Sequence, residues 1–180
     1  MAKVLYSVQM SLDGYIAGPG GDMSWLAPHL GPNPTADGLV DRIGAMLAGN
    51  RTFGGDDPNK GTDKEGAMSG AWQGPQFVLT HRPPETPVPG VTFVTDLRDA
   101  VEKAKEAAGD RYVNLLGADV ARQALAAGLV DEILTFVSPV LLGDGTRLFT
   151  QPGGAEIQLE RIRQVDHDPV AGLWYRVVKA

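Results

Sequence analysis

Three short stretches of the chain combine residue types that bind phosphate. Asn50-Arg51-Thr52 follows the apolar run AMLAG, His81-Arg82 follows QFVLT, and Gly117-Ala118-Asp119 follows YVNLL. Guanidinium, hydroxyl and backbone N–H groups are the donors that proteins offer to phosphate oxygens. Ligands of open α/β sheets lie beyond the carboxyl ends of the strands, where these stretches are expected. The pattern therefore predicts a site for a phosphate-bearing small molecule at one edge of a sheet.

The third stretch opens a predicted helix, LLGADVARQAL. A helix N-terminus carries unpaired N–H groups and a partial positive charge, so it can seat a pyrophosphate. Gly117 would allow a ligand to approach closely, and Asp119 is predicted to cap the helix. Gly128 is expected to end it shortly after Ala127.

The elements that must position these stretches follow from hydrophobic periodicity. The clearest helix begins after Asp96 as its cap and ends at Gly109. Strands are predicted at 3–10, 45–49, 76–80, 91–95, 112–116, 132–139, 156–162 and 173–178, and further helices at 35–43, capped by Thr35, and 119–127. Strands that alternate with helices and end in a strand-only tail predict an α/β sandwich with antiparallel strands at one edge. At 180 residues the chain is expected to form one domain.

Three irregular segments connect these elements. SLDGYIAGPGGDMSW is rich in glycine, and residues 50–75 form a loop long enough to suggest a functional role. PVLLGDGTRLF, residues 139–149, places Gly143 and Gly145 directly after an apolar strand. We interpret both glycines as turn residues rather than ligand contacts.

Composition excludes several classes of protein. The net charge is −6 and Lys and Arg form no block, which argues against nucleic-acid binding. No apolar run is long enough for a membrane helix, and no signal peptide is recognised. The chain has no cysteine, so disulfides, thiolate catalysis and cysteine-ligated zinc are excluded. A cytoplasmic location is expected.

Other motifs do not support a function. GPGGD lacks the third glycine of a dinucleotide-binding fingerprint, because Met23 stands there. DDPNKGTDKEG resembles a calcium loop only in its acidity. His29, His81 and His167 are too widely spaced to predict a metal pair, and no metal site is expected.

Four segments together resemble the dihydrofolate reductase-like family. They are SLDGYIAGPGGDMSWL, GNRTF, FVLTHRPP and LLGADVARQALAAGLVDEILTFVSPVLLGDGTRLF. The resemblance is greatest to the branch that contains the reductase domain of the bifunctional riboflavin-biosynthesis deaminase–reductase. GLVDE followed by PVLLGDG is the most specific part.

This resemblance implies a three-layer sandwich with a central, mostly parallel sheet of about eight strands and an antiparallel C-terminal edge. It also implies an NADPH-dependent reductase of a small heterocyclic, pteridine- or pyrimidine-like, or carbonyl substrate. In the riboflavin branch the reaction is that of 5-amino-6-(5-phosphoribosylamino)uracil reductase. PVLLGDGTRLF would close an edge of the sheet near the substrate and a subunit contact.

Carried over by position, the cofactor contacts form four groups. Gln9, Ile16, Ala17 and Trp25 would lie on the nicotinamide side, with Trp25 closing the first loop; Gly49, Asn50, Arg51, Thr52 and Asp56 would hold the pyrophosphate region; Thr80, His81 and Arg82 would surround the adenosine 2′-phosphate; Gly117, Ala118, Asp119 and Val120 would cradle the diphosphate.

The chain also departs from its relatives. Leu115 and Leu116 stand where the riboflavin branch has a substrate-binding acid, and Asp63 stands where it has a substrate-side arginine. A ribosyl-aminopyrimidine phosphate therefore fits poorly. Asp37 and Asp13 are the candidate proton donors, with an ordered water as the alternative, although Asp13 also suits an Asp-Gly turn.

Three alternatives remain open at this level. The chain could be a true dihydrofolate reductase, a non-catalytic ligand-binding protein on the same fold, or a protein that uses a flavin in place of nicotinamide. The family also implies a homodimer, and the apolar strands EILTFV and LWYRVV are expected to supply its interface.

Overall fold

The computed structural model describes residues 1–55, 57 and 59–179. Eight strands form one sheet in the order β5-β4-β3-β6-β1-β7-β10-β9. All neighbours from β5 to β7 are parallel, and β10 is antiparallel to both β7 and β9. The strands are β1 (Val4–Ser11), β3 (Ile43–Gly49), β4 (Gln76–Leu79), β5 (Val91–Val94), β6 (Tyr112–Leu116), β7 (Glu132–Ser138), β9 (Leu159–His167) and β10 (Val170–Val177).

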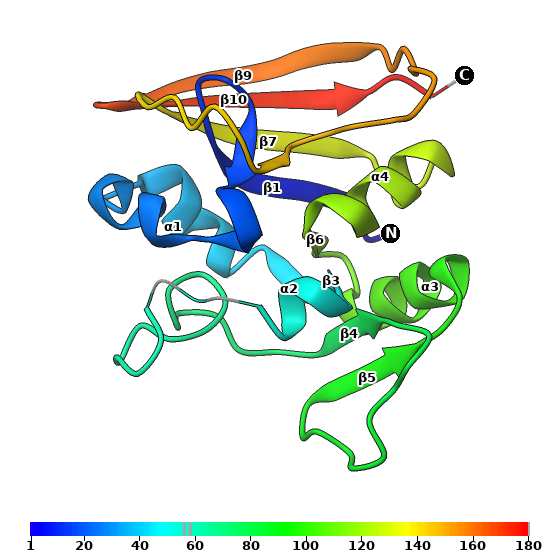
Figure 1. The fold of residues 1–180 in the computed structure, drawn as a ribbon. Coiled ribbons are helices and arrows are strands. Elements are labelled where there is room, and N and C mark those ends of the chain that lie inside the picture. Colours follow the sequence, from blue (N-terminus) through cyan, green and yellow to red (C-terminus); the bar gives the residue numbers. More distant parts are fainter. Residues whose placement is uncertain (56, 58, 180) are drawn as a thin grey trace.

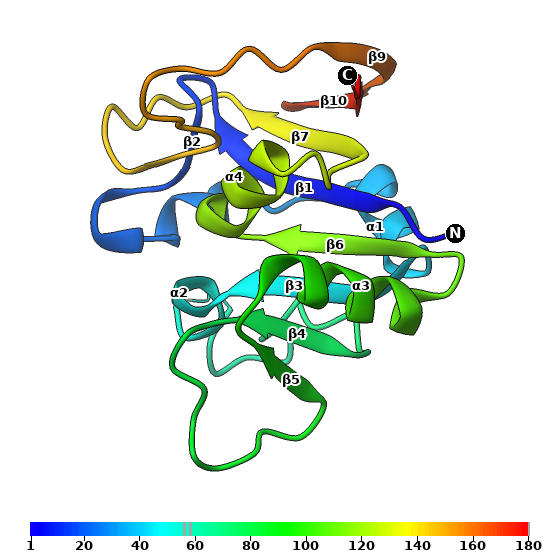
Figure 2. The same cartoon turned by 90° about the vertical axis from the view of Figure 1, so that its right-hand side faces the viewer.

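Helices and loops cover both faces of this sheet, as Figures 1 and 2 show. α3 (Leu97–Ala108) and α4 (Ala118–Ala126) lie on one face, and α1 (Pro34–Val40) lies on the other. The short helix α2 (Asn50–Phe53) follows β3 directly. These three layers, with an antiparallel C-terminal strand, confirm the predicted fold class.

Each face has its own apolar core. Val4 and Leu47 pack with Ala104 and Ala121 beneath α3 and α4. On the other face, the core residues are Leu5, Leu39, Ile43, Met46, Trp72, Tyr112, Leu134, Phe136, Val170 and Trp174. Because both faces are covered, the central strands are apolar on both sides, as parallel strands usually are.

The ends of α3 agree with the prediction. The Asp96 carboxylate accepts a 2.9 Å hydrogen bond from the Asp99 N–H, and Gly109 follows the helix at φ 65°. Two other predicted caps are wrong. Asn33 rather than Thr35 caps α1, accepting from the Ala36 N–H at 3.0 Å.

The second wrong cap belongs to α4. Gly117 occupies the N-cap position and offers no side chain, while Asp119 lies in the first turn. The Asp119 carboxylate instead accepts hydrogen bonds from Arg122 at 3.0 Å and from Gln123 at 2.9 Å. Its side chain therefore serves the helix surface rather than the helix end.

The C-terminal strands differ from the prediction in their bounds. β9 begins and ends later than the predicted 156–162 segment, and β10 is longer than 173–178. β7 and β10, predicted to supply a subunit interface, lie inside the sheet with a neighbour on each side. Their apolar side chains, such as Trp174 at 6% exposure, are used in the core.

The segment PVLLGDGTRLF does not close an edge of the main sheet. Its strand β8 (Thr146–Arg147) pairs with β2 (Tyr15–Ala17) of the first loop in a separate two-stranded sheet. Gly143 and Gly145 have φ values of 75° and 131°, and a Cβ on Gly145 would overlap the Ala17 carbonyl oxygen. These positions confirm that the two glycines are architectural.

The described residues between α2 and β4, namely 54, 55, 57 and 59–75, follow an irregular course, and Trp72 anchors them to the sheet. Trp72 is 6% exposed, and its indole N–H donates to the Ile43 carbonyl at 3.0 Å. Among the described residues, no helix has both the length and the apolar character needed to cross a membrane.

Candidate functional site

The three phosphate-compatible stretches lie at the same edge of the sheet. β4, β3 and β6 are consecutive parallel strands, and their carboxyl ends lead to Arg82, Arg51 and Gly117 respectively. Adjacent strands lie about 4.8 Å apart, so the three connections are immediate neighbours. The topology thus brings together positions separated by up to 66 residues in the chain, from 51 to 117.

The turn from β6 into α4 is the most constrained part of this edge. Gly117 has φ 102°, and a Cβ there would overlap the Thr52 hydroxyl oxygen of α2. On the other side, a Cβ on Gly49 would lie 3.9 Å from the Val120 Cβ. Gly117 therefore allows α2 and the start of α4 to meet closely, whereas position 49 has room for a Cβ.

This turn leaves backbone donors available. The N–H groups of Ala118 and Asp119 have no acceptor among the described residues, as expected for the first turn of a helix without a side-chain cap. The Val120 side chain is buried in the core, so only its backbone is available to a ligand. The arrangement can bind an anion through N–H groups at the helix N-terminus.

Cationic side chains flank the turn. Arg51 and Arg82 are exposed and form no ion pair with another described residue. The Thr80 hydroxyl accepts from the Arg82 N–H at 3.1 Å, which shapes the turn that presents His81 and Arg82. Asn50 and Thr52 are exposed on α2, and Asp56 lies outside the described residues.

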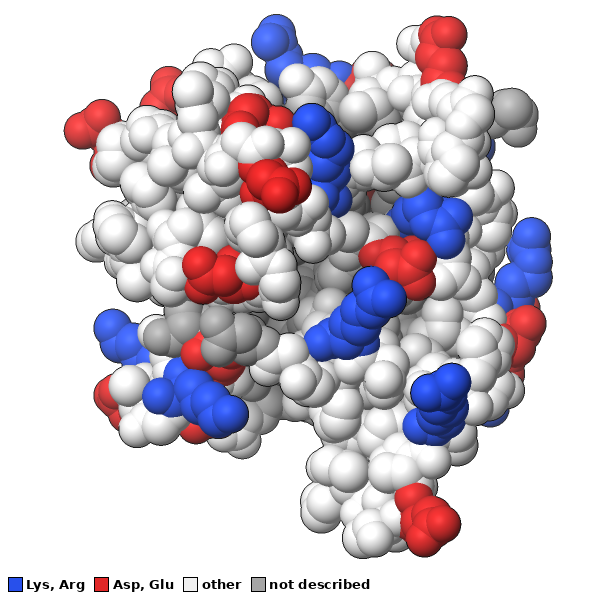
Figure 3. Space-filling model, viewed as in Figure 1, with Lys and Arg blue, Asp and Glu red and all other residues white. Residues whose placement is uncertain are grey.

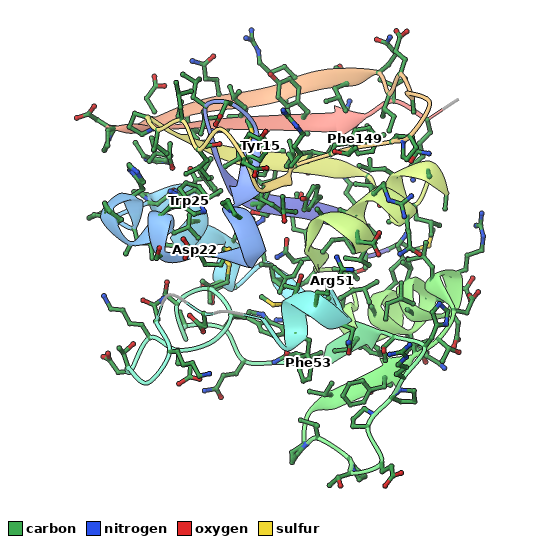
Figure 4. The ribbon with its side chains drawn as sticks, viewed as in Figure 1. Tyr15, Asp22, Trp25, Arg51, Phe53 and Phe149 are labelled. Atoms are coloured by element: carbon green, nitrogen blue, oxygen red, sulfur yellow. The ribbon has the colours of Figure 1, made fainter. Side chains whose placement is uncertain are left out.

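The first loop forms the opposite side of the site. In Figure 4, Trp25 and Asp22 lie on the loop, and Arg51 and Phe53 lie across from them on α2. The loop contains two short 3₁₀ helices, η1 (Pro19–Gly21) and η2 (Ser24–His29). The Trp25 indole N–H is buried and has no hydrogen-bond partner among the described residues.

Gln9 ties this loop to the sheet. Its side-chain N–H₂ group donates to the Ser138 hydroxyl at 2.8 Å and to the His29 carbonyl at 3.2 Å. The His29 ring in turn lies 6.2 Å from the Trp25 ring, measured between centroids. Gln9 is therefore placed to hold η2, and with it Trp25, over the end of β1.

Ile16 and Ala17 are buried in β2 at 7% and 8% exposure. Ala17 pairs with Thr146 of β8, and its carbonyl lies against Gly145. β2 thus links the first loop to the segment after β7, beside the ends of β1 and β7.

The two candidate proton donors occupy different settings. The Asp13 carboxylate accepts from the Ser11 hydroxyl at 2.6 Å and from the N–H groups of Leu142 and Gly143 at 3.1 and 2.7 Å. The Ser11 bond and these two backbone bonds lower the Asp13 pKa to about 2. Asp37 is exposed in the first turn of α1, on a side of the helix away from buried Leu39.

Two polar core residues near the site were missed in the sequence. Ser138, fully buried at the end of β7, accepts the Gln9 hydrogen bond. Asn114 is 1% exposed in the middle of β6, between Leu5 and Met46, and its amide has no partner among the described residues. A lone amide in the apolar strand YVNLL was the available signal, because buried polar groups usually have a reason.

The chain matches the family model of the RibD C-terminal domain over residues 2–171. A curated relative, the uncharacterized protein YyaP of Bacillus subtilis (strain 168), is 24% identical over 159 residues, which are 82% of this chain and 80% of that protein.

Solved structures show the same fold. A putative riboflavin biosynthesis protein from Shewanella sp. PV-4 has a TM-score of 0.74 and 26% identity, with 99% of this chain and all of that chain covered (100%). The deaminase/reductase of Thermotoga maritima has a TM-score of 0.72 at 18% identity, and 98% of this chain matches 57% of that longer one. Dihydrofolate reductase from Enterococcus faecalis, complexed with NADP(H), has a TM-score of 0.65 at 15% identity over 98% of this chain and 97% of that one.

The match to the family model covers nearly the whole chain, residues 2–171. The chain belongs to the RibD C-terminal domain family.

Proposed function

We propose that the protein is an NADPH-dependent reductase of a small heterocyclic, pteridine- or pyrimidine-like, or carbonyl compound. The observation that carries the proposal is the alignment of Arg82, Arg51 and Gly117 on three consecutive strand ends. Family relatives include a Saccharomyces cerevisiae riboflavin biosynthesis reductase, Rib7, of the same fold. Membership of this family supports a reductase activity.

The residues present fit a dinucleotide phosphate. Gly117 brings no side chain to the turn, and the N–H groups of Ala118 and Asp119 are free of partners among the described residues. Arg51 would reach the diphosphate, and Arg82 with His81 would bind the 2′-phosphate by charge-assisted hydrogen bonds. Gln9 and Trp25 would face the nicotinamide end.

When bound, NADPH supplies a hydride to the carbon of a C=N or C=O bond and leaves as NADP⁺. The protein orients the two partners and keeps the first loop over them, which limits water. The substrate nitrogen or oxygen also needs a proton. Because the Asp13 carboxylate is occupied by three donors and Asp37 is exposed, their placement favours a solvent proton over either carboxylate.

The proposal is tested by NADPH titration calorimetry on the intact chain and on the double variant Arg51→Ala/Arg82→Ala. Charge-assisted hydrogen bonds contribute about 1.5–3 kcal/mol each, so the Kd is expected to rise roughly 100-fold or more. Arg161→Ala on the edge strand β9 is the control and should leave the Kd unchanged. An unchanged Kd in the double variant would contradict the proposed seat.

Activity assays and an absorbance spectrum, together with this titration, separate the alternatives. Oxidation of NADPH with dihydrofolate would identify a dihydrofolate reductase, and tight NADPH binding without transfer to any substrate would identify a binding protein. A flavin absorbance spectrum of the purified protein would identify a flavin, rather than NADPH, as the cofactor.

We also propose a homodimer, with β9 as the contact. β9 is the exposed edge of the sheet, and Leu159 and Ile162 on it are 42% and 43% exposed. An unpaired edge strand with exposed apolar side chains is suited to a partner. Light scattering after size-exclusion chromatography tests the oligomeric state, and Ile162→Lys is expected to produce monomers.

A further inference from the structure

The strand order indicates where a substrate would lie, given the proposed function. The phosphate-compatible ends belong to β4, β3 and β6, and the next strand along is β1. With the adenosine 2′-phosphate at Arg82 beyond β4, as proposed above, the nicotinamide would lie toward β1 and the first loop. The acceptor would lie beside it, between the end of β1 and the segment that contains η2 and α1.

Apart from the loop between α2 and β4, which carries the exposed Lys60 and Lys64, the segments that would form this half contain no cation. Residues 4–41, which form β1, β2, η1, η2 and α1, include no Lys or Arg, and neither do residues 112–121 or 129–146. The same first segment carries four carboxylates, namely Asp13, Asp22, Asp37 and Asp41. Figure 3 shows acidic side chains over this segment with a basic side chain beside them, and basic side chains with an acidic one between them over α2 and α4.

Arg147 and Arg42, which directly follow two of these segments in the chain, are engaged elsewhere. The Arg147 guanidinium stacks 4.5 Å from the Tyr15 ring centroid and donates to the Tyr15 hydroxyl at 3.0 Å. Arg42 lies at the opposite edge of the sheet, before β3, and stacks on Tyr112 and Trp174 at 5.1 and 5.3 Å. Neither is placed to bind an anion beside the nicotinamide.

Two uncharged polar side chains, Trp25 and Gln9, also lie in this half. The buried Trp25 N–H needs an acceptor, and the Gln9 amide is held by Ser138 and His29 through its nitrogen. The partly buried apolar side chains Ala36, Val40, Met68 and Leu116 lie on the same face of the sheet. Such a lining recognises a ring by apolar contact and hydrogen bonds.

We infer that the substrate is a small neutral heterocyclic or carbonyl compound without a phosphate or carboxylate group. An anion taken out of water without a cationic partner is strongly disfavoured, and the nearby carboxylates would repel it. The redox balance is unchanged: hydride from NADPH and a proton from solvent reduce one C=N or C=O bond and release NADP⁺. This inference rests on the proposed function and narrows its substrate class.

Matched pairs of compounds test the inference. Benzaldehyde is compared with 4-carboxybenzaldehyde, and a ribosylated pyrimidine nucleoside with its 5′-phosphate. For each pair we measure kcat/KM with NADPH and, by calorimetry, the Kd for the protein saturated with NADP⁺. The neutral member is expected to be favoured at least tenfold in kcat/KM, or in Kd where neither member is reduced.

A charge variant sharpens the comparison. Asp22→Asn removes one carboxylate charge while the side-chain oxygen can still accept the 2.9 Å bond from the Ser24 N–H. It is expected to narrow the preference for the neutral member roughly two- to fivefold, as for other exposed charges. Asp110→Asn, at the opposite edge, is the control and should leave the preference unchanged.

The inference is overturned if the anionic members have an equal or higher kcat/KM, or an equal or lower Kd, than the neutral ones. It is also overturned if neither member of any pair binds. Loss of NADPH binding itself is read separately, in the titration without substrate. If NADPH does not bind, the proposed function fails. If NADPH binds and the anionic compounds are preferred, only the inferred substrate class is refuted.

Discussion

Gly117 and Thr52 meet where the turn before α4 crosses the start of α2. The glycine adopts φ 102°, and its missing Cβ is the space that the Thr52 hydroxyl borders. Two helices that follow different strands are thereby brought to one point of the sheet edge. A side chain at position 117 would overlap Thr52 and force α2, which carries Arg51, or the turn itself to shift.

Gly117→Ala is therefore expected to destabilise the fold and weaken NADPH binding. The Gly117 backbone, with φ 102° and ψ 142°, lies close to a region that essentially only glycine adopts, which costs an alanine about 1–3 kcal/mol. The overlap with Thr52 adds about 1–3 kcal/mol, as overpacking usually does. The free energy of unfolding, measured in urea, and the NADPH Kd are the two readouts.

Gly128→Ala is the matched control, because Gly128 has φ 68° with nothing within 4 Å of a Cβ. Gly128→Ala should lower the free energy of unfolding by the cost of a left-handed alanine, without loss of NADPH affinity. Equal effects of the two variants on both readouts would mean that the contact with Thr52 is unimportant.

The two glycines of PVLLGDG should differ in their tolerance of alanine. Gly143→Ala meets open space at φ 75° and is expected to cost about 1 kcal/mol. Gly145→Ala would overlap the Ala17 carbonyl and Gly18, so it should cost about 1–3 kcal/mol more. Thermal denaturation of both variants compares them directly. The prediction fails if Gly143→Ala is the more damaging.

The Asp13 carboxylate should make stability depend on acid pH. Its pKa in the folded protein is about 2, below the ordinary 3.8, because the ionised form accepts bonds from Ser11, Gly143 and Leu142. The folded state thus favours the ionised form, so this contribution is complete above about pH 4 and is lost as pH falls toward 2. Asp13→Asn should lose less stability than the unaltered protein between pH 4 and pH 2.

Denaturation midpoints measured from pH 2 to pH 6 check this prediction. Exposed Asp110 pairs with the N-terminus and not with the first loop, so Asp110→Asn should lose stability between pH 4 and pH 2 as steeply as the unaltered protein. If Asp13→Asn instead abolishes turnover while the loss of stability below pH 4 is unchanged, Asp13 acts in catalysis and does not stabilise the first loop.

Glu132 should matter for stability and not for cofactor binding. It is 4% exposed and accepts hydrogen bonds from Lys3 at 2.8 Å and from Tyr112 and Trp174 at 2.9 Å each. Burial, and then its hydrogen bond to Glu132, raise the pKa of Tyr112 to about 12.

Glu132→Ala would leave those donors without an acceptor, and the expected loss is about 3–5 kcal/mol. Glu132→Gln, which keeps an acceptor oxygen, should lose less. Urea unfolding and NADPH calorimetry are run side by side. Weaker NADPH binding by the folded Glu132→Gln variant would be inconsistent with the separation of this cluster from the site.

Much of the architecture was predictable because it depends on local signals. The cap at Asp96, the glycine after α3 and the apolar runs of β3, β4 and β6 belong to neighbouring residues in the chain. Parallel strands then place their carboxyl ends at one edge, whatever the details of packing. The candidate phosphate site was visible for the same reason.

Other features depend on partners far along the chain. The sequence alone does not show that Asp13 bonds residues 142 and 143, that β2 pairs with β8, or that β9 forms the outer edge. The α1 cap was misassigned because Asn33 and Thr35 are both good caps, and a contact of Thr35 with His167 accompanies the observed choice. Sequence by itself determined the helices and strands, and the edge of the sheet, at the carboxyl ends of the parallel strands, where the polar residues lie. Tertiary structure decided which of those residues stay free for a ligand, because each long-range contact removes a donor or an acceptor from the site.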